Sequence, residues 1–445
     1  MTNAPASGRH QRVLMMIMLA AVASRLLFAP TPGYDLPNFK VWQAYIANFG
    51  LSQAYSLPDP PVVYPPGYPY VLKAVSIFYR PAYPQTPEDG WSSFIMKFPI
   101  LLTDLAIGWL IFSTIRGQGL SDRSALLGCA SYLLNPGVIF NSAYWGGVDS
   151  LMGLAALGAV IAAARGAAIL PFVFISLAIL TKYQAAVLLP LVATIVFSRR
   201  GSAGLLKGLA AAAITTFVIY LPFIISGAMR TSFSLTFGSA IGLHPLLTVH
   251  AHNIWWLISM LLGSIHIADD VKILGLLSTK LFALGLLALT ALLVSARTYR
   301  TYRATNGNPE GRAKWMPFAF AALLSLAFFE LPTEMHENYL YLATLFGALV
   351  CVLSKRLWIS YCLVSVGWTL NMLLMDPAFT EMMNASPAMP PNLLHFIYLN
   401  VGPTTASNAA PSTVLNTVVI LGAAIVFAVE LLKLSTERPI REPRG

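Results

Sequence analysis

Apolar residues occur along the chain in long runs, and short polar segments separate these runs. A helix needs roughly 20 mainly apolar residues to cross the hydrocarbon core of a bilayer. We expect about twelve such helices, at residues 13–30, 93–115, 125–143, 148–164, 168–181, 184–198, 204–226, 272–296, 315–331, 338–354, 357–375 and 412–434. The helices at 168–181 and 184–198 are short and meet at Lys182. The pattern predicts an all-α, polytopic membrane protein with a single domain over residues 1–445.

The positions of the basic residues predict how these helices are oriented. Lys and Arg gather in short connections between apolar runs and at both ends: Arg9, Arg12, Arg116, Arg123, Arg165, Arg199, Arg200, the 297–314 loop, Lys355, Arg356 and the C-terminal tail. The positive-inside rule puts such segments in the cytoplasm. Three long loops then face outward, at 31–92, 227–271 and 376–411.

The outward loops contain apolar stretches too short to cross the membrane. In the first loop, "DLPNFKVWQAYIANFG" and the stretch after Pro84 are typical of amphipathic helices that lie at the interface. In the second loop, "IWWLISMLLGSI" at 254–265 is expected to lie at the interface or to re-enter the membrane.

Composition agrees with a membrane protein, since 57% of the residues are hydrophobic and 10% are charged, with a mean hydropathy of +0.68. Soluble domains contain about 25% charged residues. The net charge of +10 does not indicate nucleic-acid binding, because the basic residues follow the loops rather than one surface. Cys129, Cys351 and Cys362 lie in apolar stretches without metal-ligand spacing, so we interpret them as buried thiols.

Polar residues that are unusual in such a chain gather near the outward ends of the expected helices. They are Arg25, Asp35, Lys97, Asp149, Lys182, His252, Asn253, His336 and Glu337. Asp104 lies deeper in the second expected helix. Asp104 and Lys97 each need a partner from another segment. Ionisable groups within a membrane region are expensive and usually functional. We therefore expect them to share a water-filled cavity that opens outward.

Seven motifs occur in an order that resembles a known family: "GYDLPNFKVW", "YPPGY", "KFPILLTD", "NSAYWGGVDSL", "LTKYQAAVLLP", "HNIWWL" and "MHENYLY". The order is similar to that in GT-C glycosyltransferases, and most of all to bacterial proteins related to the second mannosyltransferase of GPI-anchor synthesis. The resemblance covers roughly residues 12 to 435. It implies a GT-C fold in a bacterial inner membrane, with the active site facing the periplasm or exterior.

The resemblance also implies an activity, namely inverting transfer of one sugar, most often a mannose-like hexose, from a polyprenyl-phosphate donor to a lipid or glycan acceptor. Such families use an Asp of the first outward loop as general base, and Asp35 matches that position. Two positions depart from the family pattern. Val63 stands where relatives carry an acid, and Glu334 stands where many carry Arg. The alternative base is Asp59, which is otherwise a turn residue, and the alternative role of Asp35 is to cap a helix.

Negative charge grows on the leaving phosphate, and fixed cations or donors would stabilise it. Lys182, His336 and Arg25 are the candidates; Arg25 could instead extend to the headgroups and Lys182 could anchor the interface. Glu337 would hold the tautomer of His336 or balance its charge, and Tyr339 is a further candidate for binding the donor. Asp149 either joins the site or caps a helix. The remaining candidates for substrate binding are Tyr64, Trp145, Gln184, His252 and Asn253.

The sequence indicates no cofactor. "HENYL" lacks the second His of a zinc motif, a His250–His252 metal pair would need a non-helical backbone, and no Gly-rich loop is present for a nucleotide. A divalent metal is therefore not indicated. The expected partners are a polyprenyl-phosphate sugar, a lipid or glycan acceptor and membrane lipids, but no nucleic acid.

Two other functions compete with the glycosyltransferase. A transporter or flippase of a lipid-linked sugar would place polar residues at mid-depth on opposed halves. A periplasmic glycan ligase or polymerase would carry paired Arg on a large outward loop, whereas Arg80 and Arg230 are the clear arginines of these loops.

Overall fold

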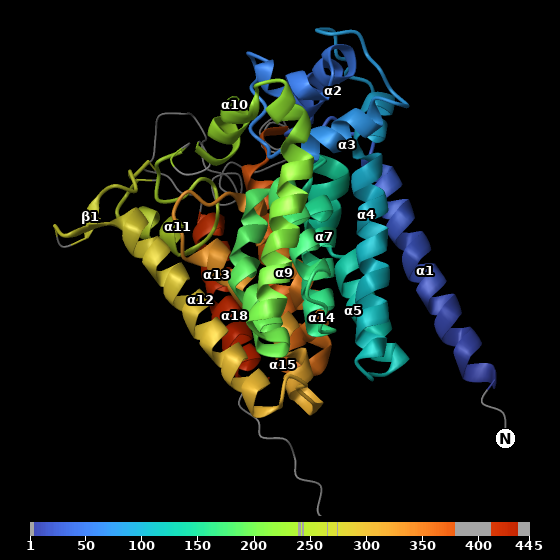
Figure 1. Cartoon of the computed structure of the whole chain (residues 1–445), viewed down its shortest axis with the longest axis vertical. Helices are drawn as coiled ribbons and strands as arrows, with labels where there is room; N and C mark the ends of the chain where they lie inside the picture. The colour runs from blue at the N-terminus through green and yellow to red at the C-terminus, as the bar shows by residue number, and fades with distance from the viewer. Residues whose placement is uncertain are drawn as a thin grey trace, which may run out of the picture.

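The protein is a bundle of helices with a cap of shorter elements at one end (Figure 1). The computed structural model describes residues 4–238, 242, 244–264, 266–273, 275–378 and 411–434. Within them, the only named strands are β1 (Lys272–Ile273) and β2 (Leu277–Ser278), which form an antiparallel hairpin. The expected all-α class is therefore confirmed, while most of the expected 376–411 loop and the tail after 434 lie outside the described residues.

The helices of the bundle lie close to the expected apolar runs. They are α1 (Ala4–Phe28), α4 (Gly90–Gly117), α5 (Asp122–Leu133), α6 (Pro136–Ile139), α7 (Asp149–Ala164), α8 (Leu170–Thr181), α9 (Leu189–Ile225), α12 (Thr279–Ala304), α13 (Met316–Glu330), α14 (Tyr341–Val350), α15 (Lys355–Met375) and α18 (Pro411–Leu434). Short segments join them: the π-helix η2 (Phe140–Trp145) and the 3₁₀ helices η3 (Tyr183–Leu188), η5 (Gly311–Trp315), η6 (Glu337–Leu340) and η7 (Cys351–Leu353).

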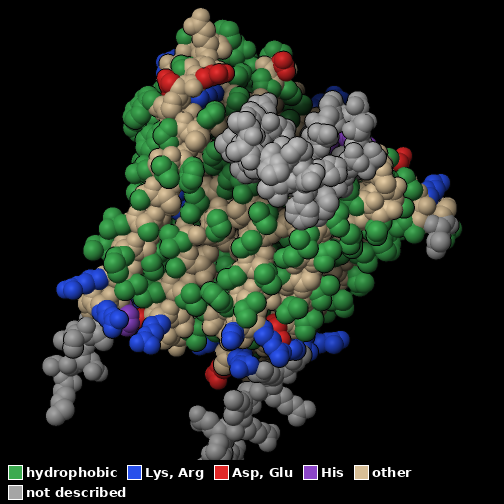
Figure 2. Space-filling view, turned by 180° about the vertical axis from the view of Figure 1, so that it is seen from behind, with side chains coloured by type: hydrophobic (Ala, Val, Ile, Leu, Met, Phe, Trp, Pro, Cys, Tyr) green, Lys and Arg blue, Asp and Glu red, His purple; other side chains and the backbone are tan. Residues whose placement is uncertain are grey.

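The bundle has the surface of a multi-pass membrane protein. Seven described helical stretches are long and apolar enough to cross a membrane, and Asp149–Ala164, Leu170–Thr181 and Glu337–Leu353 are shorter apolar helices. Large apolar side chains face outward around the bundle, for example Leu19, Leu206 and Leu292 at 59%, 66% and 67% exposure. Figure 2 shows this apolar belt, with Lys and Arg gathered at the end opposite the cap.

The longest stretch, Tyr183–Ile225, is bent where the sequence predicts a loop between two helices. Gly201 has the non-helical dihedrals φ 66° and ψ −168°. Beside it, Arg200 donates through Nε to the carbonyl of Gly166, at 2.6 Å, and Arg199 donates to the carbonyl of Ala164. The two arginines thus close the turn at the basic end of the bundle.

The cap consists of α2 (Leu36–Phe49), η1 (Leu51–Ser56), α3 (Gly67–Val75), α10 (Met229–Phe233), η4 (Ser234–Gly238), α11 (Ile254–Leu261) and the β-hairpin. The helix expected within "DLPNFKVWQAYIANFG" is α2, which buries Leu36, Phe39, Trp42 and Ile46 in a small core of its own. The helix expected after Pro84 is not formed, because residues 84–89 are irregular and lead directly into α4. The expected short element at 254–265 is α11.

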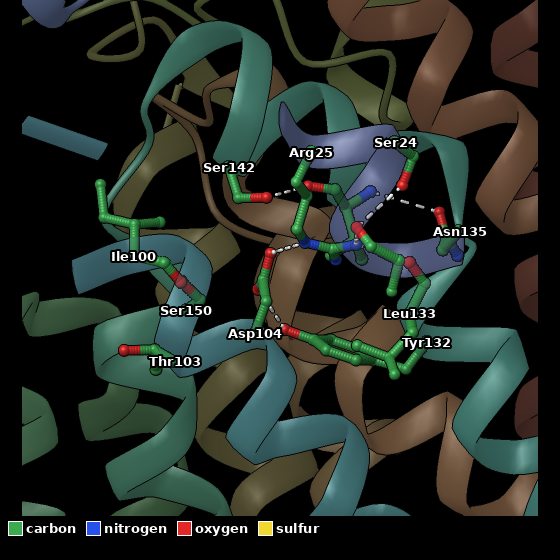
Figure 3. A network of polar contacts seen from close by, with 12 residues as sticks. Ser24, Arg25, Ile100, Thr103, Asp104, Tyr132, Leu133, Asn135, Ser142 and Ser150 are labelled. Atoms are coloured by element: carbon green, nitrogen blue, oxygen red, sulfur yellow. Dashed lines mark hydrogen bonds and ion pairs between the residues drawn. The ribbon is translucent and has the colours of Figure 1, made fainter. Parts of the chain in front are cut away.

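Two buried cations fix the position of α1 and of the loop that follows it. Arg25 binds Asp104 of α4, with 2.9 Å between Nε and Oδ2, and it also donates to the carbonyl of Leu133 (Figure 3). The hydroxyl of Tyr132 donates to the other oxygen of Asp104 at 2.8 Å and lies 2.7 Å from the hydroxyl of Tyr341. This network joins α1, α4, α5 and α14.

Lys97 is the second buried cation, and no acidic side chain among the described residues is paired with it. Its amine donates to three backbone carbonyls, those of Thr31, Ala143 and Tyr144, at 2.7–2.8 Å. The loop after α1 is thereby held against α4 and η2. The partners that Lys97 and Asp104 require thus come from distant segments.

We predict that the Arg25–Asp104 pair behaves as a buried ion pair. Arg25→Met alone should lower the free energy of unfolding by about 3–5 kcal/mol, because it leaves Asp104 charged and unpaired. The double variant Arg25→Met/Asp104→Leu should recover most of this loss. Denaturant titration in micelles measures both, with the exposed Arg230→Met as control. Equal losses in the single and double variants would contradict the prediction.

Candidate functional site

Six segments of the chain meet around a cavity of about 380 Å³ at the capped end of the bundle. They are the loop between α1 and α2, the turn before α3, the junction of α8 and η3, the π-helix η4, the segment before α11, and the segment between α13 and η6. The side chains that line it include Tyr34, Asp35, Val63, Tyr64, Pro65, Lys182, Tyr183, Thr236, His244, Val249, His250, Glu334, His336, Glu337, Asn338 and Tyr339.

Asp35 faces this cavity with a carboxylate that is not used as a helix cap. It occupies the N-cap position of α2, but its side chain makes no capping hydrogen bond. No hydrogen bond or ion pair joins this carboxylate to another described residue. Burial raises the pKa of Asp35 above its ordinary value; the charge of Lys182 opposes this rise, while that of Asp149 adds to it. A partly desolvated, unbonded carboxylate can accept a proton.

Below Asp35, a buried ion pair forms the floor of the cavity. Lys182 Nζ lies 2.7 Å from Asp149 Oδ1, and the side chains of the two residues are 5% and 0% exposed. Asp149 is the first residue of α7 and also accepts a bond from Asn141 Nδ2 at 3.1 Å, so it does not serve as a cap. The amine of Lys182 also lies 5.5 Å from the ring centre of Tyr339 and 5.9 Å from that of Tyr64.

A group of three histidines and one glutamate forms another wall. The Nδ1 atoms of His250 and His336 lie 3.9 Å and 4.0 Å from Oε2 of Glu337, and that oxygen is buried without a hydrogen-bond partner. His244 packs edge-on against His336, with 5.5 Å between ring centres. Burial, followed by the nearby His244, His250 and Lys182, lowers the pKa of His336 to about 3. His336 is therefore neutral near pH 7, with one N–H to donate.

The backbone of this wall is strained. Of the non-glycine residues described, His250, Asn306 and Glu334 have positive φ, and two of these line the cavity. Such conformations cost of order 1–3 kcal/mol and cluster at functional sites. Glu334 is held by an ion pair with Lys280 and by the backbone N–H of Gly242, which donates to its Oε2 at 2.9 Å.

Hydrogen bonds between two loops maintain the same wall. The N–H of Val249 donates to the carbonyl of Met335 at 2.9 Å, and that of Glu334 donates to the carbonyl of Leu246 at 3.1 Å. The segment before α11 is thereby fixed to the segment after α13. His250 and His336 consequently face one hollow although they are 86 positions apart in the sequence.

The structure brings together about half of the residues that the sequence singles out. Asp35, Tyr64, Lys182, His336, Glu337 and Tyr339 line the cavity, and Asp149 lies directly beneath it through Lys182. Gln184 is close to Tyr339 but is buried, with Nε2 unpartnered. Asp59 is exposed and is not among the cavity residues, as expected for a turn residue rather than a base.

Four other residues that the sequence singles out have partners elsewhere. Arg25 neither extends to the headgroups nor reaches the cavity, since it is 1% exposed and bound to Asp104. Trp145 donates to Asp376 Oδ2 at 2.6 Å, although its ring is 5.7 Å from that of Tyr34. Asn253 caps α11, and His252 is buried with Nδ1 2.9 Å from Asn416 Nδ2.

Several cavity residues are absent from the sequence-based prediction, chiefly His244, Tyr34, Tyr183 and Asn338, and His250 enters it only as a metal ligand. The repeated histidines in "LHPLLTVHAHN" are the available signal for His244 and His250. Tyr34, Tyr183 and Asn338 lie within the family-like motifs but are not singled out by them. His250 and His252 diverge, so they do not form the metal pair considered above. Among the described residues, no group of three or more His, Cys, Asp or Glu is arranged to hold a metal ion.

Comparison with known proteins adds no further constraint. No protein-family model matches the chain, and no curated protein matches it.

Gly33 sets the position of the loop that carries Asp35, and this can be tested. Its φ is +67°, and a Cβ there would lie 2.4 Å from the carbonyl oxygen of Trp145. Gly50 also has positive φ, at +98°, but has no heavy atom within 4 Å of its Cβ position. Gly33→Ala should therefore lower the free energy of unfolding by about 1–3 kcal/mol more than Gly50→Ala, because it adds a backbone clash to the strain. Denaturant titration compares the two variants, and equal losses would show that the close approach to Trp145 is unimportant.

Proposed function

We propose that the chain is an integral-membrane glycosyltransferase with a GT-C fold. In this proposal it moves a single, mannose-like hexose from a polyprenyl-phosphate donor to a lipid or glycan acceptor, with inversion. The observation that carries the proposal is the shared cavity, in which an unbonded carboxylate, a neutral imidazole and a paired amine from distant segments come together. The likeness of the motifs to the family supports the same activity.

The proposed topology has twelve crossings. Tyr183–Ile225 has 43 residues, which at ~1.5 Å per residue is about twice the ~30 Å hydrocarbon core, so its halves on either side of Gly201 form two crossings. The three shorter apolar helices cross once each, and α5 with α6 and η2 forms a further crossing. By the positive-inside rule, the basic end lies in the cytoplasm of a bacterial inner membrane. The cavity then faces the periplasm or exterior.

Asp35 is the proposed general base. An acceptor hydroxyl attacks C1 of the sugar from the face opposite the phosphate and loses its proton to the carboxylate. The bond between C1 and the phosphate oxygen breaks with its electron pair, and polyprenyl phosphate leaves as a monoester. Base catalysis requires the carboxylate to be ionised and unbonded before the acceptor arrives, and the absence of a described hydrogen-bond partner at Asp35 supports this role.

His336 and Lys182 are the proposed contacts of the phosphate. Charge grows on the leaving oxygen in the transition state, and donors already in place stabilise it without reorganisation. Glu337, whose Oε2 lies 4.0 Å from His336 Nδ1, would balance the charge of His336 if the imidazole took up a second proton beside the phosphate. Tyr34, Tyr64 and Tyr339 offer rings for a sugar face.

The alternatives are a transporter or flippase of a lipid-linked sugar and a glycan ligase or polymerase. A transporter would require polar groups at mid-depth that are open to a substrate. Arg25 and Asp104 do not line the cavity, and they are bound to each other, to Tyr132 and to the carbonyl of Leu133. The test supplies the purified protein with radiolabelled polyprenyl-phosphate mannose, glucose or arabinose and a membrane-lipid extract. A labelled acceptor product supports the transferase, whereas intact donor after full incubation contradicts it.

We predict that Asp35→Asn lowers the transfer rate by about 10²–10⁴-fold, because the amide cannot accept the acceptor proton. Donor binding should remain close to that of the wild type. Single-turnover transfer and equilibrium binding of the donor measure the two effects. Asp59→Asn is the matched control and should transfer normally; if it fails and Asp35→Asn is active, the base is Asp59.

The pH dependence of the transfer rate should follow the protonation of the Asp35 carboxylate. A raised pKa means that the carboxylate binds its proton at a higher pH than an ordinary Asp, whose value is 3.8. The rate should therefore fall on acidification, with its midpoint above that value. Lys182→Met should move this acid limb to higher pH, because the cation that lowers the pKa of Asp35 is lost. Lys433→Met, at the other end of the molecule, is the control, and an unmoved limb in Lys182→Met would contradict the assignment.

A further inference from the structure

A second cavity, a groove of about 520 Å³, lies at the basic end of the bundle between α1 and α4. It is lined by His10, Gln11, Leu14, Met15, Met18, Trp109, Phe112, Arg116 and Asp122. The groove exists because α1 leans away from the other helices toward its N-terminus (Figure 1). Only 11% of the residues in the most apolar stretch of this helix are buried. Its volume is within the usual range for sites that bind small ligands.

The two ends of the groove differ in chemistry. Toward the middle of the bundle its walls are apolar, with Met15 and Trp109 exposed at 56% and 52%. Methionine side chains adapt to irregular apolar ligands. Toward the basic end the walls are charged, with His10, Arg116 and Asp122. An occupant that matches both ends has an apolar chain and a polar headgroup.

Arg116 is held in a fixed orientation at the charged end. Its Nε lies 2.8 Å from Asp122 Oδ1, and its guanidinium carbon lies 5.5 Å from the ring centre of Phe112. Asp122 is itself fixed from the other side by His10, with 3.1 Å between Nδ1 and Oδ2. No described residue bonds the two terminal nitrogens of Arg116, whose side chain is 55% exposed. Two N–H groups in a fork match two oxygens of a phosphate.

The surrounding charge favours an anion. Arg9, Arg12 and Arg123 are exposed and lie within two residues of groove residues along the chain, whereas Asp122 is the one acid that lines the groove. We propose that the groove binds one anionic phospholipid of the leaflet at the basic end. Its phosphate lies on Arg116, and one acyl chain lies against Met15, Met18, Trp109 and Phe112.

This site is distinct from the outward cavity and does not depend on the proposed activity. Helix α1 has 25 residues, so at ~1.5 Å per residue its two ends lie about 37 Å apart. One headgroup cannot occupy both places. The same helix carries Arg25 and leads to Asp35, so a lipid that holds its N-terminal half would fix the tilt of the helix that supports the outward loop.

Quenching of tryptophan fluorescence by brominated acyl chains tests the proposal on the full-length protein. The protein is titrated in mixed micelles with brominated phosphatidylglycerol and, in parallel, with phosphatidylcholine brominated at the same positions. The contribution of Trp109 is the difference between the wild type and Trp109→Phe. We expect Trp109 to be half quenched at a clearly lower mole fraction of the anionic lipid. Equal quenching by the two lipids would show that the groove takes any surrounding lipid and would overturn the proposal.

The chain offers a matched control for the headgroup contact. Arg303, in the last turn of α12, also lies over an aromatic ring four residues earlier, 5.8 Å from the centre of Tyr299, but it lines no described groove. Arg116→Gln should raise the half-quenching fraction of the anionic lipid about fivefold, since a contact with one arginine contributes about 1 kcal/mol, and Arg303→Gln should leave it unchanged. If Arg116→Gln folds poorly, Arg116→Lys keeps the charge without the fork and should raise the fraction by less. Equal effects of the Arg116 and Arg303 variants would also overturn the proposal.

Discussion

The ion pair between Lys182 and Asp149 is the interaction on which the cavity at the capped end of the bundle depends. An unpaired charge at this burial would cost several kcal/mol, so the amine and the carboxylate must stay together. Because Asp149 begins α7 and Lys182 lies at the break between α8 and η3, the pair keeps two helix ends at the same level. For the same reason Arg25 pairs with Asp104, and Lys97 donates hydrogen bonds to backbone carbonyls. The bond from Lys97 to the carbonyl of Thr31 fixes the loop that carries Asp35. The need of each buried charged group for a partner therefore shapes the cavity as much as apolar packing does.

The sequence predicts most of the fold because a helix in a membrane must be apolar along its whole length. The expected ends at 198 and 204 coincide with the bend at Gly201, where two arginines close the turn. The shorter elements are not predicted in this way, because they do not form long apolar runs. Helix α3 has nine residues and lies against α8, with Gly67 close to the carbonyl of Leu180, so tertiary contact decides its conformation. The β-hairpin has two-residue strands, too short for an alternating pattern, and the stretch after Pro84 has helical spacing but no helix.

For the site, sequence reasoning finds Asp35, Lys182 and His336 because ionisable groups beside apolar runs are rare. It cannot separate them from Arg25, which has the same local setting but pairs with a carboxylate 79 positions away. His252 and Asn253 are likewise committed to Asn416 and to the start of α11. His244 and His250 reach the wall because backbone hydrogen bonds join the segment before α11 to the segment after α13. The residues near either segment do not predict that these two segments pair. Residue type is thus predictable here, while the partner of each residue is not.

The central claim is that the outward cavity receives the phosphate and sugar of a lipid-linked donor. The most direct measurement is an electron cryomicroscopy structure of the full chain in nanodiscs with a polyprenyl-phosphate mannose whose glycosidic oxygen is replaced by carbon. The account predicts phosphate density in contact with His336 and Lys182, with C1 of the sugar turned toward Asp35. Ligand density at the lipid-facing surface or in the groove between α1 and α4, with the outward cavity holding only solvent, would contradict it.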